Sequence, residues 1–334
     1  MSPLEKVTGD TERKVIRVEI KEGMGISQIA ELLEEKEIIR NADIMKVYSK
    51  LNKVKGLQAG KYDLCPEEDT KTIISHLEKG EVTDETINIT FVEGKNIRYI
   101  AKTIAEKTTN TEEDVFKLLE NENYINSLIE KYWFITDEIK QKDIYYPLEG
   151  YLLPDTYNFK SEDISVKEIF GVILDVTEKF LNTYKADIEK NDLTVHQLLT
   201  MASLAELEGK SLEDRKEIIG VFFNRLDIGM PLGSDVSTYY AFKVDMGDRD
   251  LTVKELNTEN PYNTRGPGMS GKIPIGPICN PSKTAIQASL DYTETDAYYF
   301  VADKNGKVYF TKNNDEHIKM ISNLKKEGLW YTYD

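Results

Sequence analysis

Residues 201–210 read MASLAELEGK, and this stretch closes an apolar run that begins at Leu198. The run predicts a helix over about 194–208 that carries Glu206 and Glu208 at its end. A separation of two residues on an α-helix corresponds to about 200° of rotation about the helix axis, so the two carboxylates face nearly opposite ways. They are therefore not placed to act as a matched acid–base pair on one bond.

Of the two acids, Glu208 is the better candidate for proton transfer. It shares its face with Met201, Leu204 and Ala205, whereas Glu206 lies with the smaller and more polar set Leu199, Ala202 and Ser203. A carboxylic acid at the end of an apolar face is partly desolvated, which raises its pKa and lets it donate a proton near neutrality. Gly209 is expected to let the chain leave the helix and open space for a ligand. From spacing alone, two solvated surface glutamates remain the alternative.

Outward from this helix, the pattern predicts a mixed α+β chain. Further helices are expected at about 166–189 and 212–228. A strand, a Glu-Gly turn and a helix occur at 15–39 and again from 87 onward, which favours a duplicated α/β unit, although any strand–turn–helix needs a glycine and an apolar stripe. Residues 14–84 read as one compact α+β module, with Asp69 or Thr70 capping a helix that ends at Gly80.

The composition changes at residue 146. The stretch YPLEGYLLPDTYNF (146–159) is dense in aromatic residues, and 229–310 is rich in Gly, Pro, Asn and Tyr. Such loops typically line a cleft. A hairpin is predicted around Lys304-Asn305-Gly306, followed by a last helix that carries His317.

Composition excludes several classes of function. The formal net charge of −16 argues against a nucleic-acid partner. Three scattered histidines and two distant cysteines, Cys65 and Cys279, predict neither a metal site nor a disulfide framework, and two buried thiols are favoured over one bridge. No apolar stretch approaches the roughly 18–20 residues that span a bilayer. His196 is expected to be an exposed residue of a helix first turn.

Two proline- and glycine-rich loops, at 259–268 and 273–281, suit a sugar ligand. Aromatic faces stack on sugar rings while amides bond hydroxyls and acetamides, which makes Tyr262, Asn263, Thr264 and Asn280 candidates. Rigid turns without a function would look similar. Asn224, at the end of the 212–228 helix, has the ordinary alternative of a cap or a surface pair.

Six segments together resemble one family: EGYLLPDTY (149–157), MASLAELEG (201–209), FFNRLDIGMPLGSD (222–235), PYNT (261–264), IPIGPICNP (273–281) and DEH (315–317). In order and spacing the sequence resembles the YceG-like endolytic murein transglycosylases, from about residue 14 to the C-terminus. Arg265 stands where that family often has an aromatic residue, and Val308 where it often has a histidine.

The resemblance implies a bacterial, membrane-anchored enzyme whose catalytic part lies outside the cytoplasm. Such an enzyme cuts within peptidoglycan glycan strands, between N-acetylmuramic acid and N-acetylglucosamine, and leaves 1,6-anhydro ends without a cofactor or metal. Its implied partners are glycan strands and a peptidoglycan synthase. The implied organisation is a polar lead-in at 1–13 after an anchor, a LysM-like module at 14–84, a strand–helix bridging region at 85–145 and a catalytic domain at 146–334.

The family's catalytic glutamate falls on Glu208, in agreement with the face argument. The remaining candidates support the reaction or bind substrate, and they are Glu206, Ser203, Glu149, Tyr157, Asn224, Asp235, Tyr262, Asn263, Thr264, Gly276, Asn280 and His317. A single glutamate suffices for a lytic transglycosylase, whereas a hydrolase usually needs two carboxylates. A peptidoglycan hydrolase and a non-catalytic wall-binding scaffold are the alternatives.

Overall fold

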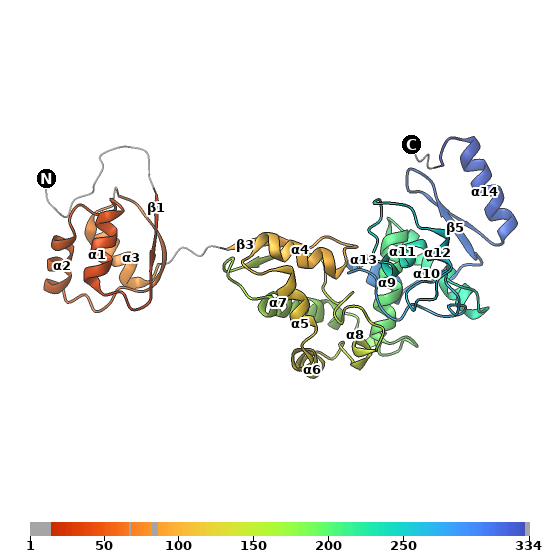
Figure 1. The fold of residues 1–334 in the computed structure, drawn as a ribbon, viewed down its shortest axis with the longest axis horizontal. Helices are drawn as coiled ribbons and strands as arrows, with labels where there is room; N and C mark the ends of the chain where they lie inside the picture. Colours follow the sequence, from red (N-terminus) through yellow and green to blue (C-terminus); the bar gives the residue numbers. More distant parts are fainter. Residues whose placement is uncertain (1–14, 67, 82–85, 331–334) are drawn as a thin grey trace. The chain divides into compact units, whose positions relative to one another are not determined.

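A computed structural model describes residues 15–66, 68–81 and 86–330 of the chain. The predicted lead-in at 1–13 lies outside these residues. The chain divides into two compact units, Met1–Thr86 and Ile87–Asp334 (Figure 1). Within both units the strands form short antiparallel pairs among predominant helices, so the predicted α+β class is confirmed.

The first unit packs three helices against one strand pair. Strand β1 (Ile16–Ile20) pairs with β2 (Gly60–Leu64), with Ile16 opposite Leu64. The helices are α1 (Ile26–Glu35), α2 (Ala42–Leu51) and α3 (Thr70–Lys79). Their apolar faces meet in a core of their own, which includes Ile20, Leu33, Tyr62 and Leu77. Of the two residues predicted to cap α3, Asp69 does so, and Gly80 ends the helix as predicted, in a left-handed conformation.

The second unit begins with a strand, a turn and a helix, as the first unit does. Strand β3 (Ile87–Thr90) leads through Gly94 into α4 (Ile97–Lys107), and Gly23 and Gly94 both have positive φ angles, 83° and 72°. The predicted recurrence is therefore present in the backbone. Strand β3 pairs with β4 (Thr156–Phe159), which joins segments far apart in the sequence.

Most of the remaining elements of the second unit are helices. They are α5 (Glu112–Leu119), α6 (Glu122–Lys131), the 3-10 helix η1 (Asp137–Lys140), α7 (Val166–Asn182), α8 (Lys185–Ile188), α9 (Val195–Glu208), α10 (Leu212–Asp227), α11 (Asp235–Ala241), α12 (Val253–Leu256) and α13 (Lys283–Leu290). The predicted hairpin is present as β5 (Tyr299–Ala302) and β6 (Val308–Thr311), and α14 (Asn314–Lys326) packs beside it (Figure 1).

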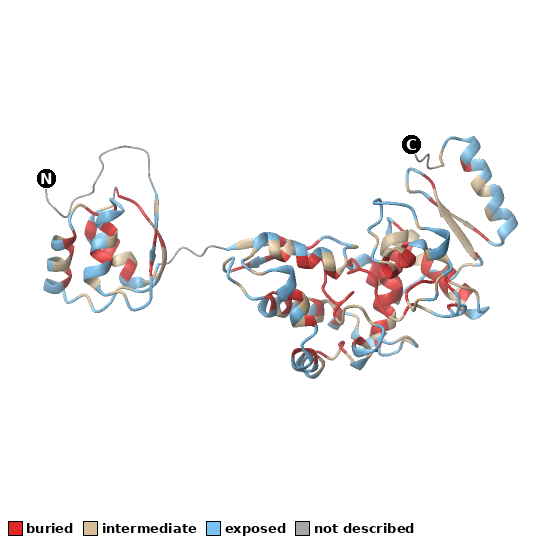
Figure 2. Cartoon of the chain, viewed as in Figure 1, coloured by how far each residue is buried: buried red, intermediate tan, exposed pale blue. Residues whose placement is uncertain are grey.

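Helix α9 is the most enclosed element of this unit. It packs against α10 and α13, and every residue from Leu198 to Ala205 is buried (Figure 2). An apolar residue on every side of the helix is typical of a core helix rather than a surface one. The core therefore fixes the position and direction of the helix end that carries the two glutamates.

The prediction for His196 is wrong. This residue is buried, its Nε2 donates to the Ile275 carbonyl oxygen at 2.9 Å, and its Nδ1 lies 2.9 Å from the Tyr151 hydroxyl. Burial lowers the pKa of the imidazole, which favours the neutral ring. The residues that cover it come from distant parts of the chain, so the local pattern gave no sign of them.

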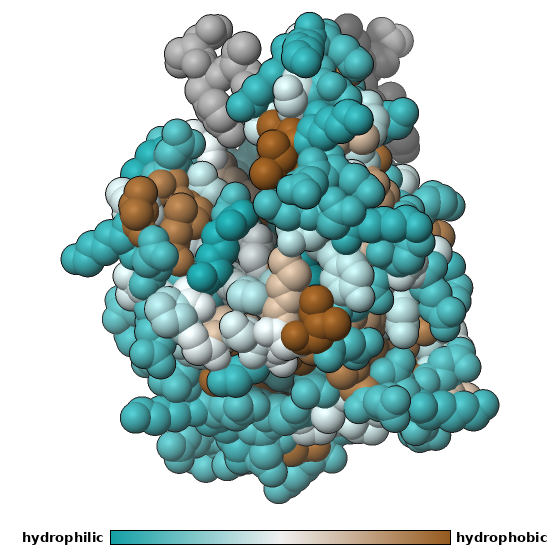
Figure 3. Space-filling view, turned by 90° about the vertical axis from the view of Figure 1, so that its right-hand side faces the viewer, coloured by the Kyte–Doolittle hydropathy of each residue, from teal (hydrophilic) through white to brown (hydrophobic). Residues whose placement is uncertain are grey.

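One face of the molecule shows how polar and apolar side chains are distributed. The face drawn in Figure 3 is mainly hydrophilic, with separate hydrophobic residues rather than one continuous apolar area. Within the described parts of the chain, no helix combines the length and apolar character needed to cross a membrane.

Candidate active site

The end of α9 is fixed by close packing against α10. Gly209 caps the helix with a φ of −119°, an ordinary extended conformation. A Cβ atom there would lie 3.0 Å from Cδ1 of Ile218 and 3.1 Å from the backbone nitrogen of Arg215. The expectation that Gly209 opens space for a ligand is therefore wrong, because the glycine instead lets α10 approach.

Glu206 is an internal anchor. Its side chain is 6% exposed, and its Oε1 accepts a hydrogen bond from Nη2 of Arg215 at 2.7 Å. Its Oε2 accepts from the backbone nitrogen of Ser282 at 2.9 Å and from the Ser282 hydroxyl. Burial raises the pKa of this carboxyl, whereas the bonds from Ser282 and the charge of Arg215 lower it. Both oxygens are thus occupied in joining α9 to α10 and to the start of α13.

Glu208 points toward a different set of groups. Its Oε1 accepts a hydrogen bond from the Ser234 hydroxyl at 2.6 Å, and among the described residues no hydrogen bond reaches Oε2. The residue is half-buried. Burial raises the pKa of the Glu208 carboxyl, and the nearby negative charge of Asp235 raises it further. The bond from Ser234 and the cations Arg265 and Arg225 act in the opposite direction.

Ser234 is held in place by the 261–265 loop. Its backbone nitrogen donates to Oγ1 of Thr264 at 2.9 Å, and its carbonyl oxygen accepts from the Ser237 hydroxyl at 2.7 Å. The Thr264 nitrogen donates in turn to Oγ of Ser237 at 3.1 Å. Thr264, predicted as a sugar ligand, is therefore placed to orient the serine that bonds Glu208. Sequence reasoning missed Ser234, although it lies in the quoted segment 222–235.

A second buried network surrounds Glu149, which is 2% exposed. Its carboxyl accepts from the backbone nitrogen of Ile97 at 3.1 Å, from the Tyr240 hydroxyl at 3.0 Å and from Nδ2 of Asn280 at 3.2 Å. Burial raises its pKa to about 8, against the bonds from Ile97 and Tyr240. Oδ1 of Asn280 accepts from the backbone nitrogen of Gly150 at 3.0 Å. The network fixes the start of α4 against α11.

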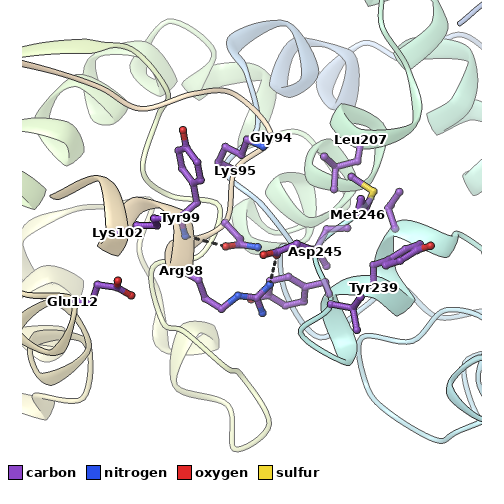
Figure 4. Close-up of a pocket in the computed structure, with 15 residues that line it drawn as sticks. Gly94, Lys95, Arg98, Tyr99, Lys102, Glu112, Leu207, Tyr239, Asp245 and Met246 are labelled. Atoms are coloured by element: carbon purple, nitrogen blue, oxygen red, sulfur yellow. Dashed lines mark hydrogen bonds and ion pairs between the residues drawn. The ribbon is translucent and has the colours of Figure 1, made fainter. Parts of the chain in front are cut away.

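A pocket of about 400 Å³ lies beside the end of α9 (Figure 4). One wall comes from the turn before α4 and from the exposed face of that helix. Facing them in Figure 4 are Leu207, Tyr239, Asp245 and Met246. Leu207 directly precedes Glu208, so the pocket adjoins the candidate acid, although Glu208 is not among the residues that line it.

Several predicted residues are engaged inside the protein. Tyr157 donates its hydroxyl to the Leu153 carbonyl oxygen, the Ser203 hydroxyl donates to the Thr200 carbonyl oxygen, and Nδ2 of Asn224 donates to the carbonyl oxygens of Thr295 and Ala297. These bonds assign the three side chains a packing role.

The loop residues Tyr262, Asn263 and Gly276 are likewise fully enclosed. The Tyr262 ring lies 4.7 Å from that of Tyr145, and Oδ1 of Asn263 accepts from the Thr238 hydroxyl at 2.7 Å. A Cβ on Gly276 would lie 3.0 Å from Nε2 of His196. Sugar stacking on Tyr262 does not fit this burial.

Two further candidates lie nearer the surface. Asp235, the first residue of α11, is exposed and forms an ion pair with Arg265. The His317 ring lies against that of Tyr299 in a tilted arrangement, with ring centroids 5.3 Å apart, and burial lowers the pKa of its imidazole. Asp235 acts on Glu208 through its charge, whereas His317 belongs to the packing of α14 against the hairpin.

No group of three or more His, Cys, Asp or Glu side chains suited to a metal ion occurs within the described parts of the chain. Cys279 is buried, and its thiol donates to the Ser203 carbonyl oxygen at 3.4 Å. Burial raises the pKa of this thiol. Cys279 thus acts as a packed core residue.

Comparison of the sequence with known protein families gives one match. The sequence model of the YceG-like family matches residues 18–323. The chain belongs to the YceG-like family. The matched range runs from within β1 to within α14, so the similarity extends over both units.

Two curated YceG-like relatives carry the name endolytic murein transglycosylase. One from Bacillus subtilis is 37% identical over 319 residues, which cover 95% of this chain and 87% of the relative. One from Streptococcus pneumoniae is 34% identical over 327 residues, and this chain spans 58% of its length. A crystal structure of a YceG-like protein from Listeria monocytogenes superposes with a TM-score of 0.65 at 33% identity, covering 92% of this chain and all of that one.

Proposed function

We propose that this protein is an endolytic murein transglycosylase, a lyase that cuts peptidoglycan strands between N-acetylmuramic acid and N-acetylglucosamine. Family membership and the names of the two relatives support the reaction class. The environment of Glu208 supports its assignment as the catalytic acid. Its carboxyl is half-buried, and one of its oxygens accepts a hydrogen bond from Ser234. Its raised pKa suits a group that must give up a proton near neutrality.

The proposed reaction needs one carboxyl. Glu208, protonated, donates its proton to the glycosidic oxygen as the bond between C1 and that oxygen breaks, and it becomes a carboxylate. The carboxylate then takes the proton of the C6 hydroxyl as that oxygen bonds to C1, which closes a 1,6-anhydro ring. Because the attack is intramolecular, it avoids the entropy cost of recruiting water.

Glu206 is not proposed as a second acid. Its two oxygens are occupied by Arg215 and Ser282, and it serves as a supporting residue that holds the end of α9. A hydrolase of the usual kind uses a second carboxylate to activate water or attack the sugar. The pair on α9 therefore does not supply the two carboxylates that such a hydrolase needs.

Mass analysis of the products tests the reaction. Uncrosslinked glycan strands are digested with the protein, and we expect fragments whose muramyl ends are lighter by one water than reducing ends. Products with reducing muramyl ends would show that the protein is a hydrolase instead. Strands that are bound but uncut would show that it is a wall-binding scaffold.

We further propose that different segments of the chain have different functions. Residues 14–84 form a LysM-like module that binds glycan, 85–145 connect it, and 146–334 carry the catalytic residues. By resemblance to the family, the native protein is held at the cell membrane with its catalytic part outside the cytoplasm and works beside a peptidoglycan synthase. Fractionation of cells that make the full-length protein, followed by crosslinking to synthases, tests both placements.

A further inference from the structure

The pocket beside α9 is lined by cationic and apolar side chains that the proposed proton transfer by Glu208 does not use. Its cations are Lys95, from the turn before α4, and Arg98 and Lys102, from the first turns of that helix. Among the lining acids, Asp245 is paired with Arg98 at 2.8 Å between Oδ1 and Nη2, and Glu112 also lines the pocket (Figure 4).

The two lysines are available to a ligand. Both are exposed, and no ion pair within the described residues involves Lys95 or Lys102. Nζ of Lys95 lies 5.2 Å from the ring centroid of Tyr99, which holds the ammonium at the pocket. In a chain of net charge −16, such a pair of unneutralised ammonium groups favours an anionic ligand.

The opposite wall is apolar and aromatic. It consists of side chains from the end of α9, from α11 and from the loop after it, namely Leu207, Val236, Tyr239 and Met246. The volume of about 400 Å³ falls at the small end of the roughly 300–1,000 Å³ typical of ligand pockets. A ligand that fits is short, carries a carboxylate and has small apolar groups.

We propose that this pocket holds the peptide stem of the strand that Glu208 cuts, an inference that rests on the proposed function. The muramyl sugar at the cleaved bond bears, on its lactyl group, a short peptide with free carboxylates and alanine methyls, whereas a strand stripped of peptide keeps only the lactyl carboxylate next to each muramyl ring. Leu207 adjoins Glu208 and Val236 is two residues from Ser234, so a stem in the pocket lies next to the reacting bond. The enzyme therefore selects stem-bearing strands over bare glycan.

Charge reversal at the two lysines tests this selection. The double variant Lys95→Glu/Lys102→Glu is compared with Lys107→Glu, which makes the same kind of change at an exposed position of the same helix outside this pocket. Each protein digests stem-bearing uncrosslinked strands and strands stripped of peptide by an amidase, and the measured quantity is the ratio of the two kcat/KM values.

We expect the wild type and Lys107→Glu to favour stem-bearing strands by about tenfold, and the double variant to bring the ratio close to one. The preference should weaken as salt rises, because exposed charges are screened. If the double variant does not fold, Lys95→Ala/Lys102→Ala replaces it. A wild type without preference, or a double variant with an unchanged ratio, would overturn the inference while leaving the reaction intact. A wild type that cuts neither substrate would overturn the proposed function as well.

Discussion

Glu206 and Glu208 stand on the same turn of α9 and differ in their neighbours. A cation and two donors of Ser282 occupy the oxygens of Glu206, whereas Glu208 has one hydroxyl on one oxygen. Glu206 has no oxygen free to meet a substrate, whereas Glu208 has one oxygen to which no described residue donates. Neighbours from other elements thus distinguish the proposed acid from the anchor.

Ser234 is the residue through which the loops act on Glu208. Replacing it by alanine removes a hydrogen bond that favours the carboxylate, so the pKa of Glu208 should rise further. Because a general acid works in its protonated form, the alkaline fall of kcat/KM should move to higher pH. The rate at neutral pH should drop about tenfold as the carboxyl loses its orientation. A pH–rate profile checks both, and a profile that coincides with that of the wild type would exclude this role.

Glu149 makes stability depend on pH. Its pKa is raised from 4.5 to about 8, so between these values the folded chain binds more protons than the unfolded chain. Stability should therefore fall as pH rises through about 8. From pH 5 to 8.5 we expect the Tm of the wild type to fall about 4 °C further than that of Glu149→Gln. Parallel Tm curves for the two proteins would show that Glu149 titrates normally in the folded state.

At the scale of elements, α10 depends on a glycine for its packing. Gly220 lies within the helix, and a Cβ there would meet the backbone oxygen of Thr293 at 2.2 Å. Glycine inside a helix ordinarily costs about 0.5–1 kcal/mol relative to alanine. Here the glycine is needed because the 293–297 segment packs directly against the helix backbone.

Alanine at two helical glycines should therefore have opposite effects. Gly220→Ala is expected to lower the free energy of unfolding by about 1–3 kcal/mol through overpacking. Gly171→Ala, in α7, meets no atom within 4 Å and should raise it by about 0.5–1 kcal/mol. Urea unfolding of both variants measures this, and a stabilised Gly220→Ala protein would contradict the packing described for α10.

The sequence predicted the helices, caps and hairpin of the fold better than it predicted which distant residues contact one another. Helix α9, the cap at Asp69 and the hairpin around Gly306 follow from local spacing, because periodicity and capping are properties of neighbouring residues. The burial of His196 and the packing of Gly209 depend on Ile275 and Ile218, which the fold brings from elsewhere. Local patterns carry no information on such partners.

For the whole molecule, each unit has a core of its own. The buried residues of β1, β2 and α1–α3 form a cluster separate from those of the second unit. A fragment of residues 1–86 should therefore fold alone, with one cooperative urea transition and dispersed amide signals in its NMR spectrum. A fragment without a cooperative transition would contradict the independence of this core.

The candidate site was predictable in part for the same reason. The apolar neighbours of Glu208 at helical spacing made it the better candidate of the two acids, and the fold gives the two side chains different partners. Ser234, Arg215 and the α4 wall of the pocket come from other elements, and only the tertiary structure places them. Tyr262 and Asn280 stood out by composition, yet burial makes them part of the framework.

The most direct test of the account is product formation by Glu208→Gln. The amide keeps the size of the side chain and cannot donate the proton, so the yield of anhydromuramyl ends from uncrosslinked strands should fall by at least about a hundredfold. Glu206→Gln, made in parallel, is expected to retain more activity, since it alters an anchor rather than the acid. Undiminished anhydromuramyl product from a folded Glu208→Gln protein would contradict the account.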